Sequence, residues 1–246
     1  MSWLSKALTS SIGRKIIVAV TGLFLCSFLV VHLVGNLQLF KNDGGVAFNI
    51  YSHFMGTNPV IRVMEIVLVA GFVFHIYETY MLTVRNKAAR GAQGYVVNHN
   101  EQNSPWQSRN MGLLGTIILI FLLVHLYNFF YRARFGELDP DINNNDDLFT
   151  LVASSFKQWW YVVLYVAAQI ALGFHLVHGF KSAFQTLGLT HRKYTPAITY
   201  TGYAFAILVA AGFAIMPLYF YFLTDDNYQP VWAVKPLVDT INLALN

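Results

Sequence analysis

Five long apolar stretches constrain the fold of this chain more than any other feature of its sequence. A bilayer core is about 30 Å thick, and a helix needs about 20 mainly apolar residues to cross it. The stretches that qualify are approximately 16–40, 60–84, 111–131, 159–180 and 197–223. Only 11% of the residues are charged, whereas a water-soluble domain carries about 25%. The sequence therefore predicts an all-α integral membrane protein, a single membrane domain over residues 1–246 with a bundle of five transmembrane helices in the lipid bilayer.

The charged residues lie mostly between these stretches, and their sign predicts the orientation. With the N-terminus in the cytoplasm, the inner segments hold ten Lys and Arg residues and the outer segments hold six. Most of the acidic residues, including those from Glu137 to Asp147, then lie outside. Lys and Arg are retained on the cytoplasmic side of membranes, so we expect a cytoplasmic N-terminus and a C-terminus outside. The net charge of +4 then reports membrane topology, and no nucleic-acid partner is expected.

Five of the eight histidines lie inside the predicted spans. They are His32, His75, His125, His175 and His178. Each of the first four spans carries at least one of them, and the fifth span carries none. Because polar side chains are costly in hydrocarbon, a histidine at this depth is a functional hypothesis by default.

Depth sorts four of these histidines into two pairs. His32 lies 18 residues past Arg14, about 27 Å at helical rise, and His125 lies 16 residues past the basic residue before its own span, about 24 Å. Both are therefore expected in the outer half of the membrane. His75 lies 10 residues before the next basic residue and His175 lies 6 before, which is about 15 and 9 Å. These two are expected in the inner half.

The sequence around the histidines repeats between spans. Phe-Leu-Val-Val precedes His32 and Phe-Leu-Leu-Val precedes His125, and a glycine lies ten residues before each of them, at Gly22 and Gly115. Spans one and two thus resemble spans three and four as a weak parallel repeat, to which the fifth span is extra. Repeats of this kind enclose binding sites at their interface.

Two imidazoles that face each other across a bundle suit a haem iron with both axial positions filled, which serves electron transfer rather than oxygen chemistry. The predicted axial ligands of the iron are His32 and His125 for an outer haem, and His75 and His175 for an inner haem. No Cys-x-x-Cys-His segment occurs, so both haems are expected to be b-type.

Three other uses of the histidines remain open at this point. They can form hydrogen bonds between helices, act in a proton or substrate relay, or bind zinc. The spans hold few acidic residues that could pass protons in a relay. These residues are Glu65 and Glu78, and both lie near span ends.

Two segments carry a resemblance to a known family. They are His32-Leu-Val-Gly-Asn-Leu in the first span and His175-Leu-Val-His-Gly-Phe in the fourth. Together with five spans and histidines in the first four, they resemble the di-haem cytochrome b membrane subunit of succinate:menaquinone oxidoreductases and fumarate reductases, the complex II family. The second segment is similar to the family's His-x-x-x-Gly segment. This similarity implies that His175 is the ligand, with His178 as the alternative.

The resemblance implies a respiratory-chain role in a bacterial cytoplasmic (inner) membrane, as a multi-pass protein. A flavoprotein subunit interconverts succinate and fumarate, an iron–sulfur subunit carries electrons to the membrane, and this chain anchors both. The chain is thus expected to be an enzyme only as part of that complex. Electrons would enter at the inner haem, pass to the outer haem and meet menaquinone near the outer face.

Polar residues near the outer ends of the spans are the candidates for a quinone site. They are Glu65, Asn36, His53 and Arg132, together with Gln38 and Asn128. Basic residues near the inner ends are candidates for pairing with propionates of the inner haem. They are Arg14, Lys15, Arg85, Arg109 and Lys181.

Two alternative functions fit the same spans. One is the cytochrome b subunit of another quinone-linked dehydrogenase or of a hydrogenase, which also uses intramembrane histidines but distributes them differently among its helices. The other is a haem-free membrane transporter or scaffold. Haem content separates this last class from the first two.

Overall fold

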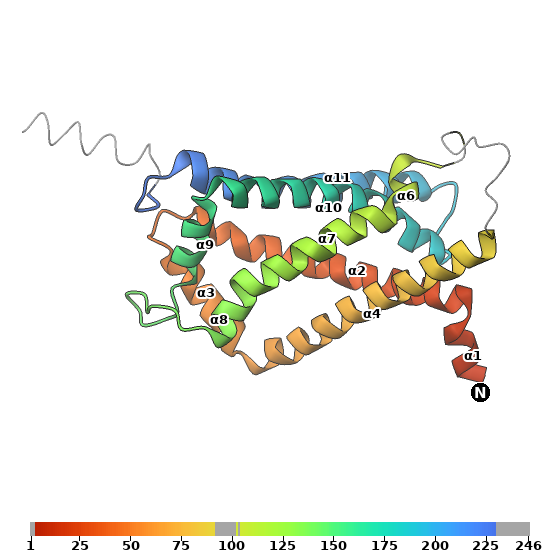
Figure 1. Ribbon diagram of the computed structural model, residues 1–246, viewed down its shortest axis with the longest axis horizontal. Coiled ribbons are helices and arrows are strands. Elements are labelled where there is room, and N and C mark those ends of the chain that lie inside the picture. Colours follow the sequence, from red (N-terminus) through yellow and green to blue (C-terminus); the bar gives the residue numbers. More distant parts are fainter. Residues whose placement is uncertain (1–2, 92–101, 103, 230–246) are drawn as a thin grey trace, which may run out of the picture. The chain divides into compact units, whose positions relative to one another are not determined.

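A computed structural model describes residues 3–91, 102 and 104–229, which form helices joined by turns and loops (Figure 1). The helices are α1 (Trp3–Thr9), α2 (Ser11–Asn36), η1 (Leu37–Phe40), α3 (Val46–Thr57), α4 (Pro59–Arg90), α6 (Trp106–Arg109), α7 (Met111–His125), η2 (Leu126–Tyr131), α8 (Arg132–Phe135), α9 (Leu148–Phe156), α10 (Trp159–Thr186) and α11 (Thr195–Leu223). Residues 92–101 and 103, between the predicted second and third spans, and residues 230–246, after the fifth span, lie outside the described residues.

Five of the helical segments are long and apolar enough to cross a membrane, which confirms the predicted all-α, five-span architecture. They are Ser11–Phe40, Pro59–Arg90, Met111–Phe135, Trp159–Thr186 and Thr195–Leu223. Several of them run past the predicted ends, for example by six residues at the end of α4. The added turns carry Lys and Arg, whose long apolar stems allow a helix to continue while the charged ends reach water.

The helix ends are set by local chemistry. Pro59 occupies the first position of α4, where its missing N–H costs nothing, and the Asn58 side-chain oxygen accepts a hydrogen bond from the Val60 N–H at 3.0 Å. At the other end of α4, Gly91 has a φ of 78°. Gly188 has a φ of 76° just after α10. Left-handed glycines at these positions terminate helices, because other residues are strained there.

The chain packs as two compact units. Unit 1 comprises Met1–Val31, Arg62–Ile118 and Ala171–Val209, and unit 2 comprises His32–Ile61, Leu119–Ile170 and Ala210–Asn246. The helices α2, α4, α7, α10 and α11 each contribute residues to both units. The single membrane domain expected from the sequence stays a prediction.

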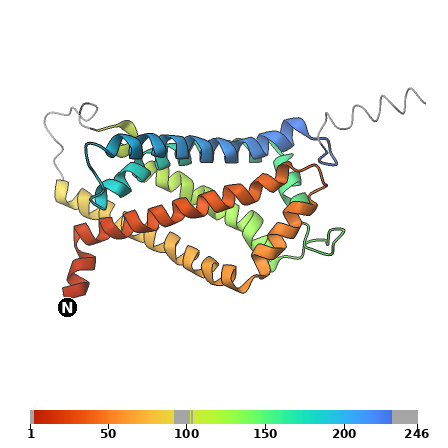
Figure 2. The ribbon, with the colours of Figure 1, turned by 180° about the vertical axis from the view of Figure 1, so that it is seen from behind.

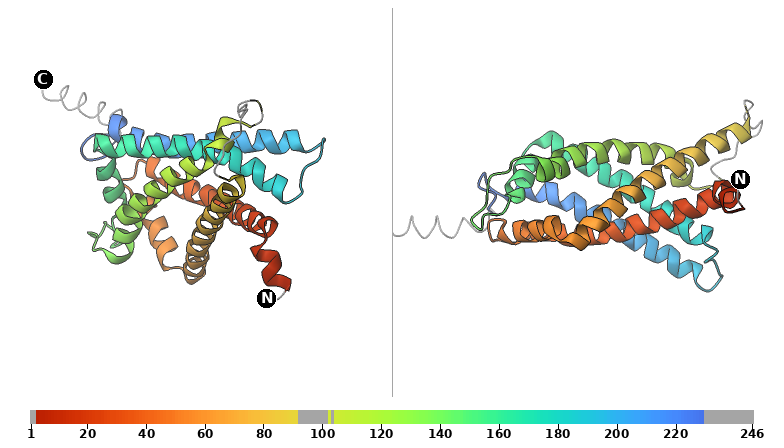
Figure 3. Two further views of the ribbon diagram at one scale, coloured as in Figure 1. Left: turned by 45° about the vertical axis from the view of Figure 1, so that its right-hand side comes forward. Right: turned by 90° about the horizontal axis from the view of Figure 1, so that it is seen from below.

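In unit 1, α1 turns away from the start of α2, as Figures 2 and 3 show. The Arg85 guanidinium of α4 donates to the Thr9 carbonyl at this turn, at 2.8 Å. Further along the same two helices, a Cβ on Gly71 would lie 3.1 Å from the Phe24 ring. The glycine thus allows α2 and α4 to approach each other closely within this unit.

Unit 2 has a core rich in aromatic side chains. Its buried members come from η1, α3, η2, α9, α10 and α11, and Phe220 of α11 is completely buried. Aromatic rings contribute the largest buried area per side chain and pack edge to face. Phe156 and Tyr165 show this arrangement, with ring centroids 5.1 Å apart at 75°.

A polar clamp joins α3 to α9 in unit 2, where Figure 1 shows the two short helices next to each other. Asn49 of α3 is 1% exposed. Its side chain donates to the Asp147 carboxylate at 3.0 Å and accepts from the Phe149 N–H at 2.9 Å. Gly45, with a φ of 88°, precedes α3, and a Cβ there would lie 2.2 Å from the Phe149 ring. No side chain larger than that of glycine fits at this position.

We expect Asn49→Ala to lower the free energy of unfolding, because it leaves the buried Phe149 N–H without an acceptor. A buried unsatisfied group costs about 1–3 kcal/mol. Chemical denaturation in detergent micelles, followed by circular dichroism, measures the change. Ser52→Ala is the matched control, since its hydroxyl bonds only the Asn49 backbone carbonyl within α3. Equal stability of the two variants would show that the clamp contributes nothing.

Candidate functional site

Unit 2 contains the first histidine pair. His32 lies near the end of α2 and His125 is the last residue of α7, and their ring centroids are 5.8 Å apart. Aromatic rings surround the pair. The Phe213 ring lies 5.4 Å from that of His32, and the Phe121 and Phe129 rings lie 5.7 and 5.5 Å from that of His125. The two imidazoles thus meet in a water-poor, apolar environment.

Unit 1 contains the second pair. His75 of α4 and His175 of α10 have ring centroids 6.5 Å apart. The repeated glycines lie against these rings: a Cβ on Gly22 would be 3.3 Å from Cε1 of His75, and a Cβ on Gly115 would be 4.0 Å from Cε1 of His175. Each glycine therefore leaves room for the histidine that follows it on the next span.

His175 rather than His178 faces His75, which favours the ligand choice implied by the sequence motif. His178 lies three residues further along α10 and is partly buried. The assignment of the four paired histidines as iron ligands stays a prediction.

The ring separations fit one metal ion between each pair. With metal–nitrogen bonds of about 2 Å and about 1 Å from each nitrogen to its ring centre, two imidazoles on opposite sides of a metal have centres about 6 Å apart. No group of three or more His, Cys, Asp or Glu side chains that could hold a metal occurs among the described residues. Each pair thus supplies two nitrogen donors, which suits an iron already held by the four nitrogens of a macrocycle better than a bare ion.

A hydroxyl group lies beside Nδ1 of one histidine in each pair. Thr21 Oγ1 is 3.2 Å from Nδ1 of His75, and the Tyr165 hydroxyl is 3.2 Å from Nδ1 of His125. A metal-binding histidine commonly donates its other ring N–H to such an acceptor, which fixes its orientation. In both cases the hydroxyl lies beside Nδ1, so the other ring nitrogen, Nε2, is available to bind a metal.

The other two histidines have different surroundings. The Asn36 amide nitrogen lies 3.4 Å from Nδ1 of His32 and also donates to the His32 carbonyl at 2.7 Å. Nδ1 of His175 is buried and has no hydrogen-bond partner in the part of the chain that the structure describes. The two members of each pair therefore differ in what holds their rings.

A local irregularity follows His125. The helix widens into the π-helical turn η2 before α8 resumes the ordinary geometry. Such turns are rare and occur frequently at functional sites. The apolar sequence Leu126-Tyr-Asn-Phe-Phe-Tyr131 carried no signal for it, because hydrophobicity does not distinguish a π-turn from an α-helix.

The quinone-site candidates lie in different surroundings. Asn36 lies beside His32, while His53 of α3 and Arg132 of α8 are exposed. Glu65 forms an ion pair with Arg62 on the same helix, α4. Of these four candidates, Asn36 alone has a contact with one of the paired histidines that the structure records.

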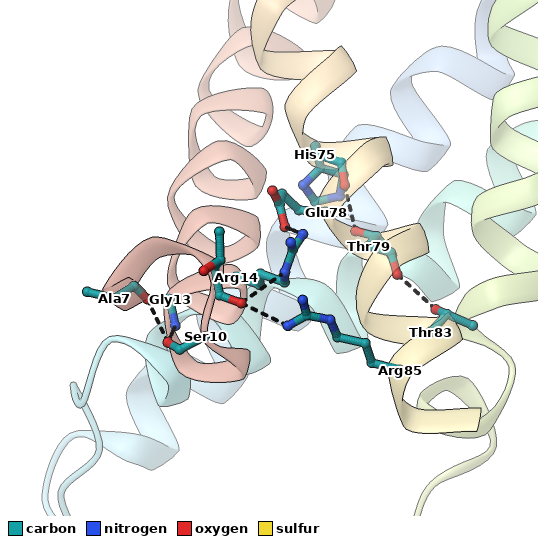
Figure 4. A network of polar contacts seen from close by, with 10 residues as sticks. Ala7, Ser10, Gly13, Arg14, His75, Glu78, Thr79, Thr83 and Arg85 are labelled. Carbon is teal, nitrogen blue, oxygen red and sulfur yellow. Dashed lines mark hydrogen bonds and ion pairs between the residues drawn. The ribbon is translucent and has the colours of Figure 1, made fainter. Parts of the chain in front are cut away.

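A buried ion pair, which the sequence did not predict, lies one helical turn from His75 in unit 1 (Figure 4). The Arg14 guanidinium of α2 donates to the Glu78 carboxylate of α4 at 2.5 Å, and the two residues are 6% and 8% exposed. Nε of Arg14 also donates to the Thr9 carbonyl at 3.4 Å. From the sequence, Arg14 was a candidate partner of a haem propionate and Glu78 an acidic residue near a span end; in the structure the two residues pair with each other.

We expect Glu78→Leu to destabilise the protein strongly, because it leaves the Arg14 charge buried without a counter-charge. Breaking a buried pair from one side costs about 3–5 kcal/mol. Glu65→Leu is the matched control, since it breaks the more exposed Arg62–Glu65 pair, for which about 0.2–1 kcal/mol is expected. Denaturant titration of both variants in micelles measures the difference. Similar losses in both would contradict the expected role of burial.

Five membrane-length helices and two histidine pairs define this chain as a multi-pass helical membrane protein with two candidate metal-binding sites. Among curated proteins, it is similar to the succinate dehydrogenase cytochrome b558 subunit of Bacillus subtilis (strain 168). The two are 28% identical over 166 residues, which is 66% of this chain and 73% of the relative. No family model matches the chain, and no solved structure matches it significantly. The predicted resemblance to the cytochrome b subunit of succinate dehydrogenases is thereby confirmed.

Proposed function

We propose that this chain is the cytochrome b membrane subunit of a succinate:menaquinone oxidoreductase or fumarate reductase in a bacterial cytoplasmic membrane. The observation that carries the proposal is the meeting of four histidines from four spans as two pairs. It is supported by the similarity to the Bacillus subtilis cytochrome b558 subunit. With the N-terminus in the cytoplasm, the segments on the cytoplasmic side carry more Lys and Arg than those outside. This excess supports a cytoplasmic N-terminus and a C-terminus outside.

The residues that would hold two b-type haems are His32 and His125 at the outer site, and His75 and His175 at the inner site. When bound, the haems would supply one-electron carriers between an iron–sulfur subunit and menaquinone. The chain's own residues bind and orient these groups and keep water away from them. The aromatic rings around His125 serve the last purpose, since burial in apolar surroundings is one control on a haem's potential.

The partners in this proposal are a flavoprotein and an iron–sulfur subunit, which would carry the succinate or fumarate chemistry. Exposed basic side chains occur at the end of α4 and in the connection between α10 and α11. They are Arg85, Lys87, Arg90, Arg192 and Lys193. These groups fall on the predicted cytoplasmic side, where soluble subunits would dock.

Single histidine replacements test the pairing. His32→Ala and His125→Ala should each remove the same haem, and His75→Ala and His175→Ala the other. A pyridine haemochrome assay on the purified complex measures the number retained, with two per chain expected for the wild type and one for each variant. His53→Ala and His178→Ala are the controls and should keep both.

The result also separates the alternatives. A wild-type protein without haem would support a transporter or scaffold and would overturn the proposal. Loss of different haems from His32→Ala and His125→Ala would contradict the pairing. Copurification with a hydrogenase or with another dehydrogenase, rather than with a succinate-active flavoprotein, would favour the alternative cytochrome b function.

Among the quinone-site candidates named from the sequence, Gln38 has the strongest support. Its side-chain oxygen is buried and has no hydrogen-bond partner among the residues described. It lies two residues beyond Asn36, which contacts His32. An unpaired buried acceptor costs free energy, and a quinol hydroxyl would satisfy it. This supports a menaquinone site near Asn36 and Gln38.

We expect Gln38→Leu to raise the KM for menaquinol several-fold and to leave both haem spectra unchanged, because it removes one acceptor for a quinol hydroxyl and no haem ligand. Steady-state assays of the complex with a soluble menaquinol analogue as electron donor measure the effect. Gln169→Leu is the matched control: its side-chain oxygen is also buried without a described partner, but it lies within the span of α10. An unchanged KM in Gln38→Leu would exclude this residue from the site.

A further inference from the structure

The contact between Thr21 and His75 has a direction. Oγ1 of Thr21 lies 2.7 Å from the Ile17 carbonyl oxygen and 3.2 Å from that of Val18, both on its own helix. A hydroxyl has one proton, and a carbonyl oxygen can only accept. The short contact to Ile17 therefore takes the Thr21 proton. Oγ1 then presents a lone pair to Nδ1 of His75 at 3.2 Å.

This lone pair selects one form of the histidine. A neutral imidazole carries its proton on either Nδ1 or Nε2. Only the form with the proton on Nδ1 makes a hydrogen bond to Thr21, whereas the other form places two lone pairs against each other. The Thr21 contact therefore favours the tautomer with the proton on Nδ1.

The residue after Thr21 gives the ring its space. A Cβ on Gly22 would lie 3.3 Å from Cε1 and 3.7 Å from Nδ1 of His75. Thr21 and Gly22 therefore act together on the His75 ring. Thr21 orients the ring, and Gly22 allows the ring to approach α2 closely.

The second repeat provides an internal comparison. Leu114, which is buried, precedes Gly115 at the position that corresponds to Thr21. Gly115 leaves room beside His175, but α7 offers no hydroxyl there, and Nδ1 of His175 has no described partner. The first repeat has a hydroxyl at this position, and Nδ1 of His75 has a partner. The second repeat has leucine there, and Nδ1 of His175 has no described partner.

We propose that Thr21 is a positioning residue that fixes His75 in the tautomer with its proton on Nδ1, so that Nε2 faces the inner haem iron. This proposal rests on the proposed function, because it assigns His75 to that iron. A hydrogen bond donated from Nδ1 makes the ligand more basic. A more basic ligand stabilises the ferric state and lowers the reduction potential of the inner haem.

Thr21→Val tests the proposal in the purified complex, because valine keeps the shape of threonine and loses the hydroxyl. The ferric–ferrous equilibrium of the inner haem should shift three- to tenfold toward the ferrous form, where tenfold corresponds to about 59 mV for one electron. Redox titration followed by optical and electron paramagnetic resonance spectra measures this shift. The outer haem should be unchanged, and Thr21→Ser should restore the wild-type potential.

Two further variants sharpen the test. Thr79→Val is the matched control, because that hydroxyl lies one turn from His75 but bonds its backbone carbonyl at 2.7 Å and not its ring. Leu114→Thr places a hydroxyl in the second repeat and should lower the potential of the inner haem, the opposite sign to Thr21→Val.

The possible results separate the two proposals. A wild-type complex without haem overturns the proposed function. Two haems in the wild type, with equal potentials in Thr21→Val and Thr79→Val, overturn the role of Thr21 alone. If Thr21→Val loses the inner haem, Thr21→Ser and Thr21→Ala decide: retention in the serine variant only supports the proposal, and any other outcome overturns it.

Discussion

A polar side chain inside a bilayer has to find its partner in the protein, because the hydrocarbon offers none. The rest of this structure depends on that constraint. The Arg14 charge meets the Glu78 carboxylate, and the hydroxyls of Thr21 and Thr79 bond carbonyls of their own helices. Among the described residues, four imidazoles from four spans meet one another instead, as two pairs. The two candidate metal sites therefore lie where imidazoles from different spans meet.

The parts of the structure that follow from distance along a helix were predictable. Each residue advances the chain by about 1.5 Å in a helix, so basic residues at span ends serve as depth markers for the histidines. Helix depth grouped His32 with His125 and His75 with His175. In the structure the ring centroids of these two pairs are 5.8 and 6.5 Å apart. The number of spans followed in the same way from the length of the apolar stretches.

The parts that depend on rotation about the helix axis were not predictable. Whether Arg14 faces Glu78, or Thr21 faces His75, is set by the packing of α2 against α4, and residues 64 and 54 positions apart give no local sign of it. The Asn49–Asp147 contact joins residues 98 positions apart through a short helix and a loop. For Thr21 one signal was available: it precedes Gly22, which the repeat had already marked.

The repeated glycines and the histidine pairs connect the spans in two different ways. Gly22 and Gly115 each make room for the histidine of the following span in their own repeat, yet each pair takes one histidine from each repeat. A single two-span hairpin with this pattern would leave room beside one histidine but would hold only one member of each pair. A second hairpin would have to supply the other histidine of each pair.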